Sequence, residues 1–223
     1  MKLLHIIADW LFPPKCILCQ KILPKDQTDL CHECRINVAP YPKNTKSIPF
    51  VKSWFALWHY DSFVRKSIHR FKFQPRPGYA ESYGRLLAAA LEGQQIPYDI
   101  ITWVPISRKR RRERGFDQTE LLAKAVAANL GLEATPLLRK IRHNPAQSGM
   151  SGFSQRKANV LGAYEAIDPQ QIAGKKILLL DDVITTGATV SECARVLLTA
   201  GAKQVSCAAI AGASKPSKEQ VKS

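Results

Sequence analysis

The sequence predicts an α/β protein with a parallel sheet at its core, preceded by a small metal-binding module. After about residue 54, segments with strand character alternate with segments of helical period, and this alternation is typical of a parallel sheet. The segment 174–180 ends in a continuous apolar run, which suits a central strand covered on both faces. Two closely spaced cysteine pairs, at residues 16–19 and 31–34, indicate the module.

Length and charge narrow the classes of protein. The 223 residues correspond to one full domain plus a small appendage. Lys and Arg total 33 against 18 acidic residues, a net charge of +15. Such a surface favours polyanions, which include nucleic acid, phosphorylated metabolites and anionic membranes. No apolar stretch is long enough for a transmembrane helix.

The N-terminal residues 3–12 resemble a signal peptide only loosely. Asp9 interrupts the apolar run, prolines 13 and 14 end it, and no small-residue cleavage site follows. We expect a short amphipathic helix whose apolar face contains Leu3, Ile7, Trp10 and Leu11. A cytoplasmic location is therefore expected, and a role at a membrane surface is the less favoured alternative.

A change in composition marks the predicted domain boundary. The segment 40–53 contains three prolines and no periodic pattern, which is typical of a connection. We expect residues 1–45 to hold the helix and the metal module, and residues 50–213 to form the α/β domain. Residues 214–223 have no apolar period, so we expect a disordered tail.

The first half of the α/β domain begins with an aromatic-rich strand at residues 54–60. A helix is expected at about 62–72. A second helix, at about 79–92, has an apolar stripe and stops at Gly93. A short buried strand at 99–104 follows.

The second half begins with a helix whose start is marked by Asp117 and by Glu120 three residues later, an Asp-headed capping box. Gly131 ends this helix. The remaining predicted elements are a strand at residues 174–180, a helix that ends at Gly201, and a strand at about 204–210.

The cysteine pairs have the spacing of a structural zinc site. Cys16 and Cys19 form one CxxC turn, and Cys31 and Cys34 form another. Each turn presents two thiolates, and two turns close a tetrahedral site with no open position. Two disulfides or a redox-active CxxC are the alternatives, but two pairs in a chain expected in the cytoplasm favour zinc. Zinc would contribute on the order of 10 kcal/mol to a segment too short to bury a core.

The strongest functional signal lies at residues 177–189, where a buried strand ends in Asp181 and Asp182 and a loop of small residues leads into a helix. Ligands of open α/β sheets bind at the carboxyl ends of strands, and N–H groups at a helix N-terminus hold phosphate. One carboxylate is expected to accept ribose hydroxyls, and the other to hold a loop or a metal-bound water. An ordinary turn is the alternative, although adjacent carboxylates beside an apolar strand need partners. The expected phosphate-binding residues are Thr185, Thr186, Gly187, Ala188 and Thr189.

This apolar strand, acidic pair and Thr-Thr-Gly-x-Thr loop resemble the signature of the type I phosphoribosyltransferases. The resemblance implies their fold, with helices on both faces of the sheet, and a site for phosphoribosyl pyrophosphate (PRPP) with Mg2+. Asp181 and Asp182 would be the catalytic pair. Ser107, Arg108 and Lys109 would hold the pyrophosphate, and the arginine and lysine would neutralise its charge. A solvated basic loop is the alternative for these residues.

Further residues resemble the ComF/GntX family, which joins a four-cysteine module to this fold. They comprise Val104, Pro105, residues 114–118, Gln147, Gly149, Arg156, Asn159 and residues 162–164, and together with the cysteine pairs and the acidic loop they extend the resemblance over about residues 14–212. Asp117 departs from the family, which usually has Asn there, but it can still cap a helix.

Two more expectations follow from the resemblance. Residues 140–160 are similar to a mobile flap that would exclude water from the reaction, with a simple surface loop as the alternative. Thr185 stands where purine-salvage relatives often carry Asp, so a classical purine acceptor is not expected. The sequence does not indicate whether the site catalyses a reaction or only binds PRPP.

The ComF resemblance implies a role in DNA uptake during natural transformation. The basic run at residues 108–114 would contact single-stranded DNA through Arg108, Lys109, Arg110, Arg111, Arg112 and Arg114. Aromatic residues in the N-terminal half are candidates for base stacking, although core packing is favoured for them: Trp54, Phe55, Trp58 and Tyr60. The alternative function is a metabolic phosphoribosyltransferase with an unidentified acceptor.

Overall fold

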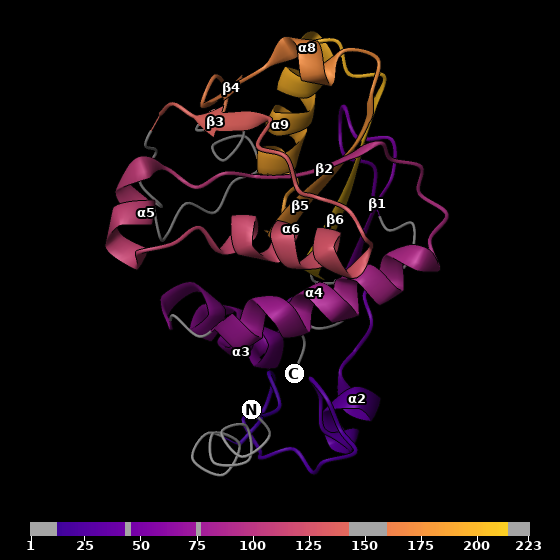
Figure 1. Cartoon of the computed structure of the whole chain (residues 1–223), viewed down its shortest axis with the longest axis vertical. Coiled ribbons are helices and arrows are strands. Elements are labelled where there is room, and N and C mark those ends of the chain that lie inside the picture. Colours follow the sequence, from indigo (N-terminus) through magenta and orange to yellow (C-terminus); the bar gives the residue numbers. More distant parts are fainter. Residues whose placement is uncertain (1–12, 43–45, 75–76, 143–159, 214–223) are drawn as a thin grey trace, which may run out of the picture.

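The computed structural model describes residues 13–42, 46–74, 77–142 and 160–213, and its core is a four-stranded sheet (Figure 1). The strands lie in the order β1-β6-β5-β2, and every neighbouring pair is parallel. Their bounds are Trp54–His59 for β1, Ile100–Trp103 for β2, Lys176–Ile184 for β5 and Gln204–Gly212 for β6. The predicted α/β fold with a parallel sheet is confirmed.

Strand β5 is central, and it is longer than its apolar run. Leu178, Leu179 and Leu180 are completely buried, because helices cover both faces of the sheet. Pairing with β6 continues through Asp181 to Ile184. The acidic pair therefore lies inside the last part of the strand, and its two side chains point to opposite faces of the sheet.

One face of the sheet is covered by three helices: α3 Ser62–Phe73, α4 Pro77–Glu92 and α6 Gln118–Asn129 (Figure 1). Helices α4 and α6 approach closely at Gly84, where an added Cβ would lie 2.5 Å from the Cβ of Ala125. This glycine allows the two helices to pack side by side over the sheet. The helices expected at 62–72, at 79–92 and after Asp117 are confirmed.

The opposite face is covered by helix α9, Ala188–Thr199, and by an antiparallel hairpin (Figure 1). The hairpin pairs β3, Leu138–Lys140, with β4, Tyr164–Ala166, and the short helix α8, Pro169–Ile172, follows it. This hairpin was not among the elements expected from the sequence. Of the predicted flap, residues 143–159 lie outside the described residues.

The cysteine module, which contains helix α2 (His32–Asn37), packs on α3 and α4 (Figure 1). Side chains of the module share a buried cluster with side chains of these helices, among them Ile17, Leu18, Leu23, Leu30, Ile68, Phe71 and Tyr83. Arg85 forms an ion pair with Asp29 at 2.5 Å. Module and sheet domain therefore share one core, and the predicted domain limits stay a prediction.

Two predicted segments, the amphipathic helix at 3–12 and the tail at 214–223, lie outside the described residues. In the part of the chain that the structure describes, no helix combines the length and apolar character needed to cross a bilayer.

Candidate functional site

Asp182 is a buried carboxylate whose charge is compensated from two helices. The Nζ of Lys72 on α3 lies 2.9 Å from one carboxylate oxygen and 3.0 Å from the other. The amide of Gln118 on α6 donates to Asp182 at 2.9 Å. With both partners in place, Asp182 joins α3, α6 and β5 at the carboxyl edge of the sheet.

Asp181 has different surroundings on the opposite face. It has no ion-pair partner among the described residues, and its carboxylate accepts the N–H of Asp182 at 2.8 Å. Burial, together with the negative charge of Asp182, raises the pKa of Asp181 well above its ordinary range. Asp181 is therefore the member of the pair whose carboxyl group would gain most from a cation or a hydroxyl donor.

The loop after β5 is shaped by Gly187 and held by the segment that enters the domain. Gly187 has a left-handed conformation, with φ at 81°, and helix α9 begins directly after it. Lys46 donates to the backbone carbonyl of Thr185, and the side chain of Ile48 packs against Gly187. The loop thus presents the N-terminus of α9, a 12-residue helix, where backbone N–H groups favour an anion.

The basic run forms a helix, α5, Arg108–Arg114. Ser107 caps its start by accepting the N–H of Arg110 at 3.3 Å, and Gly115 ends it in a left-handed conformation. Arg111 pairs with Glu120 at 3.1 Å. No carboxylate lies within ion-pair distance of Arg108, Lys109, Arg110 or Arg112 in the described ranges.

The segment after α5 connects the basic run to the acidic pair. The amide oxygen of Gln118 accepts from Arg114 at 2.7 Å, while its amide nitrogen donates to Asp182. Asp117 caps α6 as predicted, accepting the N–H groups of Thr119 and Glu120. Its other oxygen accepts the N–H of Ile106 at 3.0 Å, so the same carboxylate also holds the loop before α5.

A cavity of about 380 Å³ lies between the start of α5 and the hairpin. Five cationic side chains and one carboxylate line it, and the carboxylate, Glu165, pairs with Arg139. Among the described residues the other four cations have no carboxylate partner: Arg108, Lys109, Lys140 and Arg142. The cavity is therefore suited to a ligand group with several negative charges.

Lys140 lines this cavity and is close enough to Asp181 to interact with its charge. Burial lowers its pKa, Arg110 lowers it further, and the negative charge of Asp181 opposes the shift. Its Nζ lies 5.0 Å from the ring centroid of Tyr164. The structure thus places Ser107, Arg108 and Lys109 around one cavity with a lysine that interacts electrostatically with Asp181.

Sequence reasoning missed several residues of this site, namely Lys46, Lys72, Gln118, Arg139 and Lys140. Gln118 belongs to the segment that resembles ComF proteins, which could have drawn attention to it. The others have no local signal, because their positions depend on packing between distant parts of the chain.

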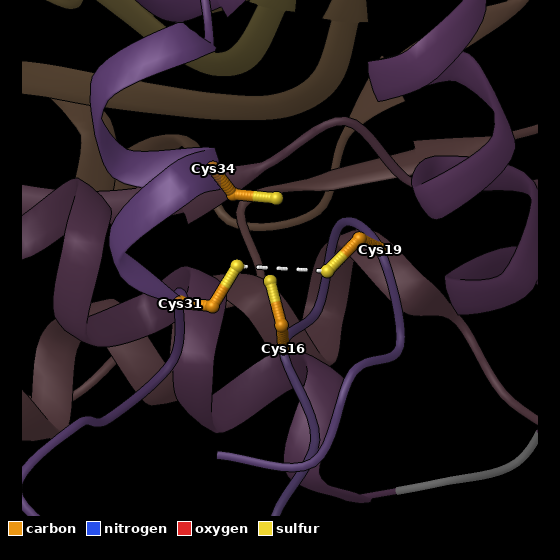
Figure 2. A group of neighbouring side chains, drawn as sticks. All are labelled: Cys16, Cys19, Cys31 and Cys34. Atoms are coloured by element: carbon orange, nitrogen blue, oxygen red, sulfur yellow. Dashed lines mark hydrogen bonds between the residues drawn. The ribbon is translucent and has the colours of Figure 1, made fainter. Parts of the chain in front are cut away.

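The four cysteines converge at one point of the module (Figure 2). Their sulfur atoms all lie within 4.8 Å of one another, and Cys19 and Cys31 are 3.6 Å apart. Tetrahedral zinc with Zn–S bonds of 2.3 Å would need sulfur atoms about 3.8 Å apart. Burial and the adjacent sulfur atoms raise the pKa of the Cys34 thiol, and a bound cation would reverse this effect.

Two protein-family models match this chain, one at the cysteine module and one at the α/β domain. A double zinc ribbon domain matches residues 7–45, and a phosphoribosyl transferase domain matches residues 119–223. Together with the sulfur geometry, the first match identifies Cys16, Cys19, Cys31 and Cys34 as a structural zinc site. The second confirms the predicted phosphoribosyltransferase fold.

Individual relatives cover nearly the whole chain. DNA utilization protein YhgH of Salmonella typhimurium is 30% identical, over 85% of this chain and 86% of that protein. Competence protein F of Haemophilus influenzae is 25% identical, over 86% of this chain and 93% of that protein. Among solved structures, the allosteric regulatory enzyme of purine biosynthesis matches with 20% identity and a TM-score of 0.43, over 62% of this chain and 29% of that one. This chain carries the zinc ribbon followed by the phosphoribosyl transferase domain. Together with the two relatives that match most of its length, this order shows that the chain belongs to the ComF family.

Proposed function

We propose that this protein binds PRPP and single-stranded DNA and acts in the cytoplasm in DNA uptake during natural transformation. The observation that carries the proposal is the cationic surface of α5 and the hairpin, joined through Gln118 and Lys140 to the acidic pair. The printed names of the relatives, a DNA utilization protein and a competence protein, support the DNA part.

PRPP would span the carboxyl edge of the sheet. Residues 185–189 would hold its 5′-phosphate at the start of α9. Asp181 would accept ribose hydroxyls, and Asp182, already paired, would keep α3 and α6 in position. The cavity beside Ser107 would take the pyrophosphate, whose charge Mg2+ would share with Arg108, Lys109 and Lys140.

Single-stranded DNA would lie along α5. Arg108, Lys109, Arg110 and Arg112 project from a helix in which none of them has an ion-pair partner within the described part of the chain, so they can meet phosphates. Arg111 and Arg114 already have protein partners. Phosphate contacts bind strands of any sequence and weaken as salt rises.

A metabolic phosphoribosyltransferase is the second candidate function, and the unpaired Asp181 beside the Thr-Thr-Gly-x-Thr loop favours it. In that reaction an acceptor nucleophile would bond to C1 of the ribose while pyrophosphate leaves with the bonding electron pair. The acceptor would have to be found by experiment.

One titration separates the two candidates. We expect labelled oligothymidylate to bind with a steep salt dependence, and Arg108→Glu with Arg112→Glu to weaken binding and to flatten the log–log slope by about 1.4, or roughly 0.7 per lost contact. Lys175→Glu with Lys203→Glu makes the same charge change at the amino end of β5 and β6 and should have little effect. PRPP should compete with the DNA at least in part.

Each other outcome is informative. Wild-type protein that ignores DNA at low salt but consumes PRPP with a small acceptor would establish the metabolic function. Equal losses in the two double variants would mean that the protein's overall charge, rather than α5, attracts the DNA.

A further inference from the structure

An exposed aromatic residue lies where the basic helix meets α3. Phe73, the last residue of α3, is 55% exposed. His69 packs against it, with ring centroids 4.6 Å apart, and Lys66 continues the same exposed helix face at i, i+3, i+7 spacing. Arg114 of α5 places its guanidinium carbon 4.9 Å from the centroid of the Phe73 ring. We call Lys66, His69, Phe73 and Arg114 the Phe73 patch.

The patch is held in a defined geometry by buried partners. Arg114 donates to Gln118, which donates in turn to the buried carboxylate of Asp182. Lys72, the residue before Phe73, pairs with the same carboxylate. Both sides of the patch are therefore anchored to Asp182, so the ring and the guanidinium keep their arrangement without a ligand.

None of the aromatic residues named from the sequence has this exposure. Trp58 is buried, and Trp54, Phe55 and Tyr60 are partly buried and pack against the core clusters. Single exposed apolar residues are common on proteins. The Phe73 ring differs because both a histidine and an arginine contact it, and because this arginine is the last residue of α5, which contains six basic residues.

We propose that the Phe73 patch stacks an unpaired base of single-stranded DNA whose phosphates follow α5. This inference rests on the DNA binding proposed above. Aromatic rings and arginine planes are the groups on which proteins stack exposed bases. Arg110 lies one turn before Arg114 on the same side of α5, so a strand whose base meets Phe73 can place its phosphates along that helix. Charge complementarity favours single-stranded DNA as the ligand of the patch, because each stacked base is attached to a phosphate that can contact the basic residues of α5.

The test compares two ligands with the same charge. Oligothymidylate and an abasic oligomer of equal length carry the same phosphates, but only the first has bases. We expect wild-type protein to bind oligothymidylate about tenfold more tightly. Phe73→Ala should remove this preference, should leave affinity for the abasic oligomer unchanged, and should leave the salt slope unchanged because phosphate contacts remain. Phe63→Ala, at a phenylalanine of the same helix that is 37% exposed, is the matched control.

A second variant keeps the test independent of folding effects. Phe73→Trp should retain the preference, and oligothymidylate but not the abasic oligomer should quench its fluorescence. Equal binding of both ligands by wild-type protein, or equal weakening of both by Phe73→Ala, would overturn the stacking site while leaving DNA binding intact. An absence of binding to either ligand would overturn the proposed DNA function as well.

Discussion

At the scale of single residues, the acidic pair shows how neighbours in sequence acquire different properties. Asp181 and Asp182 are consecutive in β5, so their side chains lie on opposite faces of the sheet. Asp182 forms an ion pair with Lys72 and accepts a hydrogen bond from the amide of Gln118. Burial and the negative charge of Asp182 raise the pKa of Asp181 and so disfavour its charged form. The two carboxylates therefore have different electrostatic surroundings.

The raised pKa of Asp181 predicts a specific pH dependence of stability. The folded protein holds this proton more tightly than the unfolded chain does, so the resulting stabilisation is complete below the ordinary value of 3.8 and is lost as pH rises through the folded pKa. Urea unfolding of the wild type should show this loss. Asp181→Asn should lack it and should be at least as stable at neutral pH.

Asp182→Asn is the contrasting variant in the same experiment. It leaves Lys72 without its carboxylate and should cost about 1–3 kcal/mol at neutral pH. Identical pH profiles for wild type and Asp181→Asn would contradict the burial of an uncompensated carboxyl group.

At the scale of elements, the loop between β5 and α9 depends on a segment far away in sequence. Lys46 and Ile48 belong to the connection after the zinc module, yet they contact Thr185 and Gly187. The positive φ of Gly187 turns the chain from strand to helix. Its lack of a side chain admits Ile48, so the loop has little freedom to accept a larger residue.

Gly187→Ala should therefore weaken binding of PRPP with Mg2+. The new methyl group would lie about 3.0 Å from the Ile48 side chain, and the φ of 81° is unfavourable for alanine. Gly174→Ala is a matched control, because Gly174 also has a positive φ but no atom within 4 Å of an added Cβ. Calorimetry should show weaker binding for Gly187→Ala alone, while thermal unfolding should show lower stability for both. Normal binding by Gly187→Ala would place the phosphate elsewhere.

At the scale of the whole molecule, the zinc module is part of the main core rather than an attached unit. Ser67 and Arg70 of α3 donate to backbone carbonyls of the first cysteine turn, and Arg85 of α4 pairs with Asp29. Apolar residues of the module share a buried cluster with α3 and α4. The metal that closes the module therefore also supports α3, the helix that carries Lys72, the ion-pair partner of Asp182.

Loss of zinc should consequently destabilise the entire protein. Cys34→Ser should bind less zinc and should unfold in one transition at a lower temperature, measured by elemental analysis and scanning calorimetry. Cys193→Ala removes a thiol that is buried in α9, so it should keep a full complement of zinc. An unchanged main transition in Cys34→Ser, with a separate early melting of the module, would show that the two parts unfold independently.

Several features of this protein could be predicted from the sequence because they depend on short stretches of chain. The zinc ligands belong to two local turns, Asp117 caps a helix that begins one residue later, and the apolar run before the acidic pair marks a buried central strand. In each case, neighbouring residues supply the geometry, so spacing and residue type are sufficient.

Only the tertiary structure decided which distant residues complete the site. Lys72 and Gln118 reach Asp182 from two different helices, the hairpin brings Lys140 toward Asp181, and Arg114 meets Phe73. The exposure of Phe73 and the burial of Trp58 likewise depend on which helix covers which face. These outcomes follow from packing between elements far apart in the chain, for which no local pattern of residues exists.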